Sequence, residues 1–385
     1  MRIKICAPVL GLREASSLGG AVFDYYNLKG LADQGIEMHI PVVYRLECRQ
    51  HPGWKIYRIP LRRGYKVGPL LVNLLFLIWV IRIWRKSRFH ILMVRSPEIL
   101  GYLSWTIRCL LPVKTVGLYC HLEPENRVQR WFNQKIAHSF SCVTAPSQFT
   151  KRQLMERYRL PEERIRVVYH GVPEDISAAE EAGNTPVLTE IPLDGKKVLL
   201  YVGALSARKN LFFLLDVFEK VKERHPRILL ILCGGRAHPR DRYDTKLKSE
   251  VKKRELDDSV IFTGERTPFE KAALFRRADI FVFPSLLEGF GFAVSEAMAM
   301  GKPIVCSNRA SLPELIENEV TGLLSDAQDL GTFTAQLNRL LEDEALGHRL
   351  GQSARLVAEK RFTWTRSSVE YTTFFKDLLS QRGRP

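Results

Sequence analysis

The chain has 385 residues, of which 45% are hydrophobic, with a formal net charge of +16 and seven cysteines. This length and composition exclude a small stapled scaffold and allow two domains with full hydrophobic cores. The odd number of cysteines, with no Cys-x-x-Cys pair, predicts reduced thiols rather than disulfides or metal ligands, and Met1–Cys6 (MRIKIC) leads into no secretory signal, so we expect a cytoplasmic protein.

The net positive charge of the chain comes entirely from its first part. Residues 1–170 carry 27 Lys and Arg against 11 Asp and Glu, whereas residues 171–385 carry 31 of each. This asymmetry indicates an anionic partner for the first part, with a charge that serves only solubility as the alternative. A membrane surface or a phosphorylated acceptor is favoured over nucleic acid, because the sequence has no recognition motif and no basic-aromatic repeat.

The first predicted strand, residues 2–7, ends in a loop that runs through Gly11 to Gly19 and Gly20, and a helix is expected over residues 21–32. A glycine turn at the carboxyl end of a strand is where an open α/β sheet binds ligands. We therefore expect Gly19 and Gly20 to lie against a ligand. The alternative is an ordinary turn whose glycines serve steric needs.

Residues 67–88 contain an apolar run, Leu74–Ile81, that is too short to span a bilayer, which takes about 20 residues. Trp79 and Trp84 lie next to a basic end, and further basic residues precede the segment, which suits a helix lying in a lipid interface. A core helix of the first domain is at least as good an interpretation, and both hold if one face packs inward. The basic residues concerned are Arg58, Arg62, Arg63, Lys66, Arg82, Arg85, Lys86 and Arg88.

His121 follows the strand predicted over residues 113–119, at the edge of the sheet where ligands bind, and Glu123 and Glu125 are close in sequence. It is a candidate for a ligand pocket, although a lone histidine more often only satisfies hydrogen bonds. A helix over residues 148–158 and a strand over residues 165–169 come next. The stretch from residue 172 to residue 195 is rich in Pro, Gly, Ala and acids, lacks periodicity and predicts an interdomain linker.

The second half alternates strand and helix regularly, which predicts a doubly wound parallel sheet. Strands are expected at residues 197–202, 228–233, 260–263, 279–283 and 303–306. Thr267 with Glu270, and Ser311 with Glu314, have the spacing of capping boxes at helix starts. Arg208 and Lys209 lie in the loop before a helix expected over residues 211–224, from which their side chains can reach a diphosphate.

The stretch from Phe281 to Gly301 (FVFPSLLEGFGFAVSEAMAMG) is the most informative one. It predicts a strand, a loop with Gly289 and Gly291, and a helix from Phe292 to Met300, an arrangement that binds phosphate at the helix N-terminus. Glu288 and Glu296 frame this loop. Carboxylates accept hydrogen bonds from sugar hydroxyls, so these residues together predict a ligand with phosphate in the middle and polyols at both ends, as in a nucleotide sugar.

Glu288-x7-Glu296 with its inner GFGF resembles the signature of family-four retaining glycosyltransferases, and most closely that of bacterial mannosyl and O-antigen-type group 1 enzymes. The stretches APSQFTKRQLMERY and VVYHGVPED resemble this family too. The resemblance implies the GT-B fold, with two Rossmann-like doubly wound parallel-sheet domains facing across a cleft. The implied parts are an acceptor domain over residues 1–171, joined by a C-terminal helix over residues 364–385, a linker over 172–195 and a donor domain over 196–363.

The resemblance also implies roles for particular residues. Glu288 would hold the donor sugar, Glu296 the ribose hydroxyls, and His121 would line the sugar pocket. Many relatives have Arg directly after the glycine that corresponds to Gly203, whereas this chain has Ala204, so we expect Arg208 to supply that cation. Further donor contacts are implied for Gly19, Gly20, Gly203, Gly234, Gly235, Glu265, Arg266, Gly289, Phe290, Gly291 and Phe292.

These features together predict an enzyme that transfers a hexose, with retention, from a UDP- or GDP-sugar to a cell-envelope glycan or lipid-linked acceptor. We expect no cofactor and no metal, since the sequence lacks a convincing Asp-x-Asp pair and the acidic residues 342–344 are expected within a C-terminal helix. The enzyme would be cytoplasmic, with the inner face of the cell membrane as a candidate partner of its basic part. A sugar-nucleotide epimerase and a non-catalytic nucleotide-sugar-binding scaffold are the alternatives.

Overall fold

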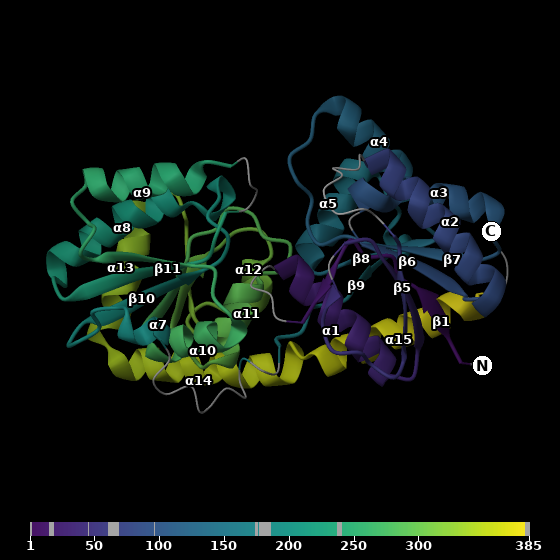
Figure 1. The fold of residues 1–385 in the computed structure, drawn as a ribbon. Helices are drawn as coiled ribbons and strands as arrows, with labels where there is room; N and C mark the ends of the chain where they lie inside the picture. Colours follow the sequence, from purple (N-terminus) through teal and green to yellow (C-terminus); the bar gives the residue numbers. More distant parts are fainter. Residues whose placement is uncertain are drawn as a thin grey trace. The chain divides into compact units, whose positions relative to one another are not determined.

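The computed structural model of the chain describes residues 2–14, 19–44, 46–60, 69–95, 97–173, 176, 186–236 and 241–381 (Figure 1). The chain forms two compact units, each with its own parallel sheet. The first unit comprises Met1–Ala15, Gly20–Gly171 and Trp364–Pro385, and the second comprises Ser16–Gly19 and Val172–Thr363. The predicted class, α/β with two doubly wound parallel sheets, is confirmed.

The first unit contains a seven-stranded sheet in the order β5-β3-β1-β6-β7-β8-β9, in which all pairs are parallel. Its central strands are buried apolar runs, as a parallel sheet covered on both faces requires. The strands are β1 (Lys4–Cys6), β3 (Glu37–Val42), β5 (Trp54–Arg58), β6 (Ile91–Arg95), β7 (Lys114–Leu118), β8 (Cys142–Ala145) and β9 (Ile165–Val167). A separate parallel pair joins β2 (Leu12–Arg13) to β4 (Leu46–Glu47).

Helices cover both faces of this sheet (Figure 1). α1 (Gly19–Asp33) and the C-terminal helix α15 (Trp364–Ser380) lie together, with Tyr26 stacked on Trp364 at 5.8 Å between ring centroids. The opposite face carries α2 (Pro69–Ser87), α3 (Pro97–Leu110), α4 (Arg127–Ser139) and α5 (Gln148–Tyr158), and a short 3-10 turn, η1 (Glu162–Arg164), precedes β9. The C-terminal helix is therefore part of the first unit's fold.

The helix α2 tests the two interpretations of residues 67–88, a helix in a lipid interface and a core helix. One face is buried in the core of the unit through Val72, Phe76, Val80 and Ile83, as the core-helix interpretation expects. The other face leaves large apolar side chains exposed. Trp79 is half-buried against Tyr57, so it does not lie on that exposed face. The predicted basic residues Arg62, Arg63 and Lys66 lie outside the described residues.

The second unit has a six-stranded parallel sheet in the order β12-β11-β10-β13-β14-β15. Five strands fall where the apolar runs predict them. Four of these runs are buried on both faces of the sheet, whereas the edge strand β12 is mostly half-buried. The sixth strand, β15, was not expected. The strands are β10 (Lys197–Val202), β11 (Ile228–Cys233), β12 (Val260–Gly264), β13 (Ile280–Phe283), β14 (Ile304–Ser307) and β15 (Leu323–Ser325).

In the second unit, α8 and α9 lie on one face of the sheet and α10 and α11 on the other (Figure 1). The long helix α14 packs along α11. The described helices are α7 (Pro186–Thr189), η2 (Ala207–Lys209), α8 (Leu211–Arg224), α9 (Tyr243–Lys253), α10 (Pro268–Arg277), α11 (Phe292–Ala299), α12 (Leu312–Leu315), α13 (Leu330–Glu342) and α14 (Glu344–Arg361).

Two helix starts test the capping predictions. The capping box of Thr267 and Glu270 is present at the start of α10. The one predicted for Ser311 and Glu314 is wrong, because Ser311 makes no cap hydrogen bond to α12 and uses its hydroxyl elsewhere. The acidic residues 342–344 are not inside one helix either; Asp343 ends α13 and caps α14 by accepting from Leu346 N.

Parts of the segment predicted as a linker, residues 174–175 and 177–185, lie outside the described residues. The described part begins with Val172, which pairs with Thr363 in an isolated bridge and donates to Phe362 O at 2.9 Å. It continues with α7, which packs on α10. No described helix of the chain is both long enough and apolar enough to cross a membrane.

Candidate functional site

Two loops of the second unit leave the sheet at the same place. The chain first moves outward from β10 through β11 to β12 and then returns to β13 on the other side of β10, so the strand order reverses between β10 and β13. Their register pairs Leu199 with Ile280 and Leu200 with Phe281. Because parallel strands end at the same edge, the segments after Val202 and after Phe283 lie side by side, at the switch point where α/β sheets bind ligands.

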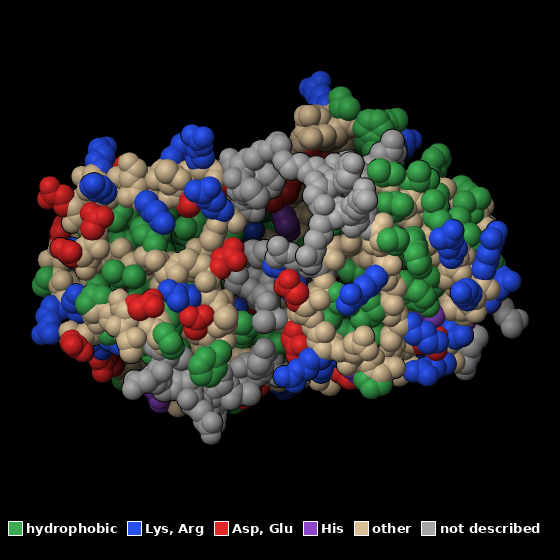
Figure 2. All heavy atoms as spheres, viewed as in Figure 1, with side chains coloured by type: hydrophobic (Ala, Val, Ile, Leu, Met, Phe, Trp, Pro, Cys, Tyr) green, Lys and Arg blue, Asp and Glu red, His purple; other side chains and the backbone are tan. Residues whose placement is uncertain are grey.

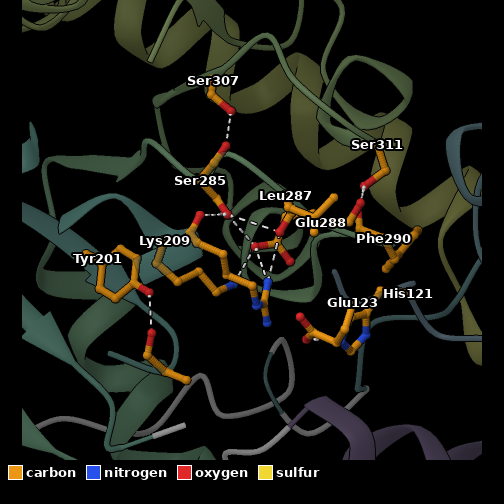
Figure 3. A network of polar contacts seen from close by, with 12 residues as sticks. His121, Glu123, Tyr201, Lys209, Ser285, Leu287, Glu288, Phe290, Ser307 and Ser311 are labelled. Atoms are coloured by element: carbon orange, nitrogen blue, oxygen red, sulfur yellow. Dashed lines mark hydrogen bonds and ion pairs between the residues drawn. The ribbon is translucent and has the colours of Figure 1, made fainter. Parts of the chain in front are cut away.

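Three donors from these two loops converge on one oxygen of Glu288 (Figure 3). Oε1 accepts from Lys209 Nζ at 2.5 Å, from Ser285 Oγ at 2.6 Å and from Arg208 Nη1 at 3.1 Å. Among the described residues, Oε2 of the same carboxylate accepts no hydrogen bond. The network thus orients the carboxylate through one oxygen and leaves the other for a ligand.

The electrostatics of this group favour a bound anion. Burial raises the pKa of Glu288, but Lys209 and Arg208 lower it more, so the pKa lies below its ordinary value and the carboxylate is ionised at neutral pH. Burial lowers the pKa of Lys209, and Glu288 opposes that shift without cancelling it. With Arg208 charged as well, two cations face one carboxylate, which leaves one positive charge over.

Aromatic rings also lie next to Lys209. Its ammonium lies 4.6 Å from the centroid of the Phe283 ring, and Tyr201 stacks on Phe283 at 5.7 Å. The Tyr201 hydroxyl donates to Ala204 O at 2.9 Å, and thus holds the turn after β10. The resemblance leads us to expect Arg208 to replace a cation missing at Ala204, and its guanidinium contacts the Glu288 carboxylate.

The loop that carries Glu288 is held by two hydroxyls, one at the end of β14, the other neighbour of β13, and one in the segment that follows β14. Ser307 Oγ donates to Ser285 O at 2.5 Å. Ser311 Oγ donates to Glu288 O at 3.1 Å and to Phe290 O at 2.8 Å, which is the use of this side chain that replaces the predicted helix cap. The buried loop backbone is therefore fixed by side chains that the motif itself does not contain.

The helix α11 begins directly after this loop. Gly291 adopts φ 106°, a left-handed conformation that glycine tolerates best, and Phe292 is the first helical residue. Gly289 and Phe290 belong to the loop itself, and the Phe290 ring is buried edge-on against Phe292 at 5.4 Å. The first turn of α11 thus follows Glu288 by four residues, which brings the positive end of the helix dipole to the same loop.

Glu296 forms a second, separate pair. Its Oε1 accepts from Lys271 Nζ of α10 at 2.6 Å, and both side chains are almost fully buried. No hydrogen bond or ion pair between described residues joins this pair to the Glu288 group. The two glutamates of the motif are therefore each matched to a lysine from another element.

The remaining predicted residues of this unit surround the same sheet edge. Gly203 and Gly234 directly follow β10 and β11, and their backbones lie very close together. A Cβ on Gly234 would lie 1.9 Å from Gly203 O, so only glycine fits at position 234. Next to them, a Cβ on Gly235 would lie 2.6 Å from the Glu265 carboxylate. Arg266 is engaged inside the unit, donating to Thr263 O and pairing with Glu270 and Glu190.

Gly20 and His121 belong to the first unit, and Gly19 is the first residue of its helix α1. Both glycines lie within the first turn of α1 rather than before it, since the helix begins two residues earlier than expected. A Cβ on Gly20 would lie 3.0 Å from Arg95 Nη1, and Arg95 pairs with Asp24 at 2.5 Å. Burial raises the pKa of Asp24 to about 6 although Arg95 lowers it.

His121 lies three residues beyond β7, not at the strand end itself. Its Nε2 lies 2.7 Å from Glu123 Oε1, and both side chains are exposed. The structure thus brings Glu288, Arg208 and Lys209 together in one group of the second unit. Glu296 forms its own pair nearby in sequence, and His121 has a carboxylate partner in the first unit.

Sequence reasoning missed three serines that hold the Glu288 group, Ser285, Ser307 and Ser311, and it missed Lys271, the partner of Glu296. Ser285 and Ser307 follow predicted strands directly, which is a usable signal, and Lys271 is a lysine inside the apolar run KAALF. Ser311 was misassigned to a cap. Within the described ranges, no group of three or more His, Cys, Asp or Glu could hold a metal ion.

Two family models match the chain in succession. The model described as "Glycosyltransferase Family 4" matches residues 19–176, and the one described as "Glycosyl transferases group 1" matches residues 190–357. Together they cover most of both units. They also divide the chain in the segment that the sequence predicts as a linker.

Individual relatives show moderate identity. The chain is 27% identical over 285 residues to the putative glycosyltransferase YtcC of Bacillus subtilis, covering 71% of this chain and 70% of that protein. It is 28% identical over 260 residues to O-antigen chain mannosyltransferase B of Escherichia coli, covering 66% of each. With the D-inositol 3-phosphate glycosyltransferase of Corynebacterium glutamicum it shares 27% over 265 residues, covering 68% of this chain and 63% of that one. The matched part thus spans about two thirds of these relatives.

Solved structures share the fold over nearly the whole chain. The sucrose-phosphate synthase from Thermosynechococcus elongatus superposes with a TM-score of 0.78 at 19% identity, covering 98% of this chain and 100% of that one. Anabaena HepE in complex with UDP-glucose superposes with a TM-score of 0.76 at 17% identity, again covering 98% and 100%. At these identities the likeness establishes the fold, which is GT-B.

Proposed function

Because the chain belongs to the group 1 and family 4 glycosyltransferases, we propose that it transfers a hexose from a nucleoside diphosphate sugar to an acceptor, with retention at the anomeric carbon. The observation that carries this proposal is that the two oxygens of the Glu288 carboxylate have different surroundings. Oε1 is occupied by Lys209, Ser285 and Arg208, and Oε2 is left as an acceptor for hydroxyls of the donor sugar. An ionised carboxylate accepts such hydrogen bonds strongly.

The two cations beside Glu288 suit the leaving group. When the bond between the anomeric carbon and the diphosphate oxygen breaks, the electron pair leaves with the nucleoside diphosphate, whose negative charge grows. Arg208 and Lys209 carry one positive charge more than Glu288 neutralises, and Lys209 is held in a buried position where its charge is poorly screened. The helix α11, which begins directly after the same loop, adds the positive end of its dipole. With these groups offsetting the charge, we propose that the transfer needs neither a metal nor a cofactor.

Glu296 would hold the ribose hydroxyls of the donor. The ion pair with Lys271 fixes one oxygen of this carboxylate, as Lys209 does for Glu288. Gly203, Gly234, Gly235 and Glu265 lie where the neighbouring strands end, which suits backbone contacts to the nucleotide. From the resemblance to the family, we also propose donor contacts for Gly19, Gly20 and His121.

The donor would be a UDP- or GDP-sugar and the acceptor a glycan or lipid-linked molecule of the cell envelope. The relatives support this choice: one is an O-antigen chain mannosyltransferase and another a D-inositol 3-phosphate glycosyltransferase. The excess of basic residues in the first 170 residues suits an acceptor that carries phosphate. We place the enzyme in the cytoplasm, at the inner face of the cell membrane.

The test follows both products. Full-length protein is incubated with UDP- and GDP-hexoses, an isoprenoid-phosphate-linked glycan as acceptor, and EDTA, and the released nucleoside diphosphate and the glycosylated acceptor are measured together with their anomeric configuration. Equal amounts of the two products, with the donor's configuration, support the proposal, and Glu288→Gln should abolish both. An altered nucleotide sugar without release of nucleoside diphosphate would instead indicate an epimerase. Tight donor binding without either product would indicate a scaffold.

A further inference from the structure

Three helices of the first unit, α2, α3 and α4, leave an unusual number of large hydrophobic side chains exposed. They pack side by side in this order on one face of the seven-stranded sheet (Figure 1). Of the fourteen large hydrophobic side chains exposed among the described residues, nine lie on these helices, whereas the whole second unit has three. We call these nine the outer apolar surface: Leu71, Leu74, Ile78, Tyr102, Trp105, Leu110, Val128, Trp131 and Phe132.

The outer apolar surface is additional to the core. On α2, the buried residues Val72, Phe76 and Val80 alternate with the exposed Leu71, Leu74 and Ile78, so that the helix is apolar on two opposite faces. α3 repeats the pattern, with Ile107 buried and Trp105 64% exposed. Figure 2 shows hydrophobic side chains gathered over α2 and α3 on the face toward the viewer. A surface helix of a soluble unit needs only one apolar face, so the second face requires another partner.

The charges on these helices are almost all of one sign. Their 46 residues contain seven Lys or Arg and a single acid, Glu98. The basic residues are exposed and flank the apolar ones, at the C-terminal end of α2, on α3 and along α4: Arg82, Arg85, Lys86, Arg108, Arg127, Arg130 and Lys135. Apolar side chains bordered by cations match the acyl boundary and the headgroups of an anionic bilayer.

The aromatic residues fit the same partner. Trp105, Trp131 and Tyr102 have a large apolar body and a polar edge, which is the chemistry enriched where a membrane meets water. Lys135 holds its ammonium 5.8 Å from the Trp131 ring, so apolar and cationic groups occur together even at the level of single side chains. The surface therefore combines apolar side chains, which can enter the acyl boundary, with cations, which attract anionic headgroups.

A second copy of the chain is a poorer occupant. A symmetric dimer built on this surface would place the same patch of each copy against the other. Basic residues of one copy would then face basic residues of the other, and the like charges would repel. Anionic lipid headgroups remove this repulsion instead of adding to it.

We propose that the outer apolar surface of α2, α3 and α4 docks the protein onto a bilayer that contains anionic lipids, with the three helices lying in the interface. The inference goes beyond the sugar-transfer site: it stands on the first unit alone and does not depend on Glu288 or its neighbours. It also replaces the expectation from sequence that Trp79 and Trp84 lie in the lipid interface, because both are half-buried against the core.

The test is co-sedimentation of the full-length protein with vesicles of phosphatidylcholine alone and of phosphatidylcholine with phosphatidylglycerol. We expect binding to the anionic vesicles that weakens as salt is raised. The triple substitution Leu74→Ser, Trp105→Ser and Trp131→Ser should reduce it at least tenfold, and Arg85→Glu with Lys86→Glu should reduce it mainly at low salt. Unchanged binding by the triple variant would overturn the proposal.

Two controls keep the outcome decisive. Phe269→Ser with Leu356→Ser removes exposed apolar side chains of the second unit and should leave vesicle binding unchanged. A polarity-sensitive dye on Cys109, the exposed cysteine of α3, should shift to the blue only with anionic vesicles. Should sedimentation velocity instead show a dimer that the triple variant dissolves, with no vesicle binding, the surface would belong to a second copy and the proposal would fail. Donor turnover in free solution should be the same in all these variants.

Discussion

Lys209 Nζ lies 2.5 Å from Glu288 Oε1, although the two residues are 79 positions apart in the chain. One follows β10 and the other follows β13, and the reversal of strand order between these neighbouring strands brings them together. Both are nearly fully buried, so each compensates the charge of the other. This pairing lets one carboxylate be oriented, ionised and still open to a ligand at its second oxygen.

Replacing Glu288 by Gln should lower kcat by about 100-fold or more, because the neutral amide accepts weaker hydrogen bonds from the donor sugar. The same change leaves the charges of Arg208 and Lys209 uncompensated, so the free nucleoside diphosphate should bind at least as tightly as before. Calorimetry with UDP and GDP, next to turnover assays, separates the two effects. A parallel loss of turnover in Glu344→Gln, which removes an exposed carboxylate elsewhere in the unit, would argue against a specific role.

Replacing Lys209 by Met should destabilise the second unit by about 3–5 kcal/mol, since it leaves the buried Glu288 carboxylate without its closest counter-charge. It should also weaken diphosphate binding. Urea unfolding of the two single variants and of Lys209→Met with Glu288→Gln forms a double-mutant cycle. The double variant should recover most of the lost stability without recovering turnover. Additive losses in unfolding free energy would mean that the two side chains do not interact.

Ser311→Ala should raise the KM for the donor while costing only about 1 kcal/mol of stability, because it frees the backbone of the loop at Glu288 and Phe290. Thr267→Ala is the matched control. It removes a genuine helix cap, at the start of α10, and should cost a similar amount of stability. Only the Ser311 variant should change the KM, and equal effects of both on the KM would show that general loosening is responsible.

The sequence predicts most of the second unit and less of the first, for a physical reason. Strands of the second sheet such as β11 (ILLILC) are buried on both faces and read as uninterrupted apolar runs. In the first sheet, β3 contains Glu37, His39 and Pro41, and β5 is an edge strand with exposed Lys55 and Arg58. Such mixed patterns do not distinguish a strand from a loop.

The candidate site is likewise predictable from the sequence only in part. Glu288, Arg208 and Lys209 are predictable as members of one site because they follow strands whose ends share an edge. The sequence does not indicate that all three donors use a single oxygen, since this depends on the path of the loop. Nor does it single out Ser311, because serine is common in loops and the Ser-x-x-Glu spacing suggests a cap.

His170 supplies a prediction about pH. It is buried next to Phe23, with ring centroids 4.6 Å apart, and it stacks on Trp364 of α15 at 6.0 Å. Burial lowers its pKa to about 3, well below the ordinary value of 6.5, so the native state favours the neutral ring. Above the ordinary histidine pKa, which applies in the unfolded chain, this residue does not reduce the free energy of unfolding. As the pH falls from there toward 3, the unfolded chain gains a proton that the folded chain does not, and the free energy of unfolding decreases. Between pH 7 and pH 4 the free energy of unfolding of the first unit should decrease by about 3 kcal/mol through this residue.

The test is urea unfolding of His170→Gln, which cannot gain a proton. Its free energy of unfolding should decrease by about 3 kcal/mol less between pH 7 and pH 4 than that of the original protein. Parallel curves of unfolding free energy against pH would mean that His170 titrates alike in the folded and unfolded chain.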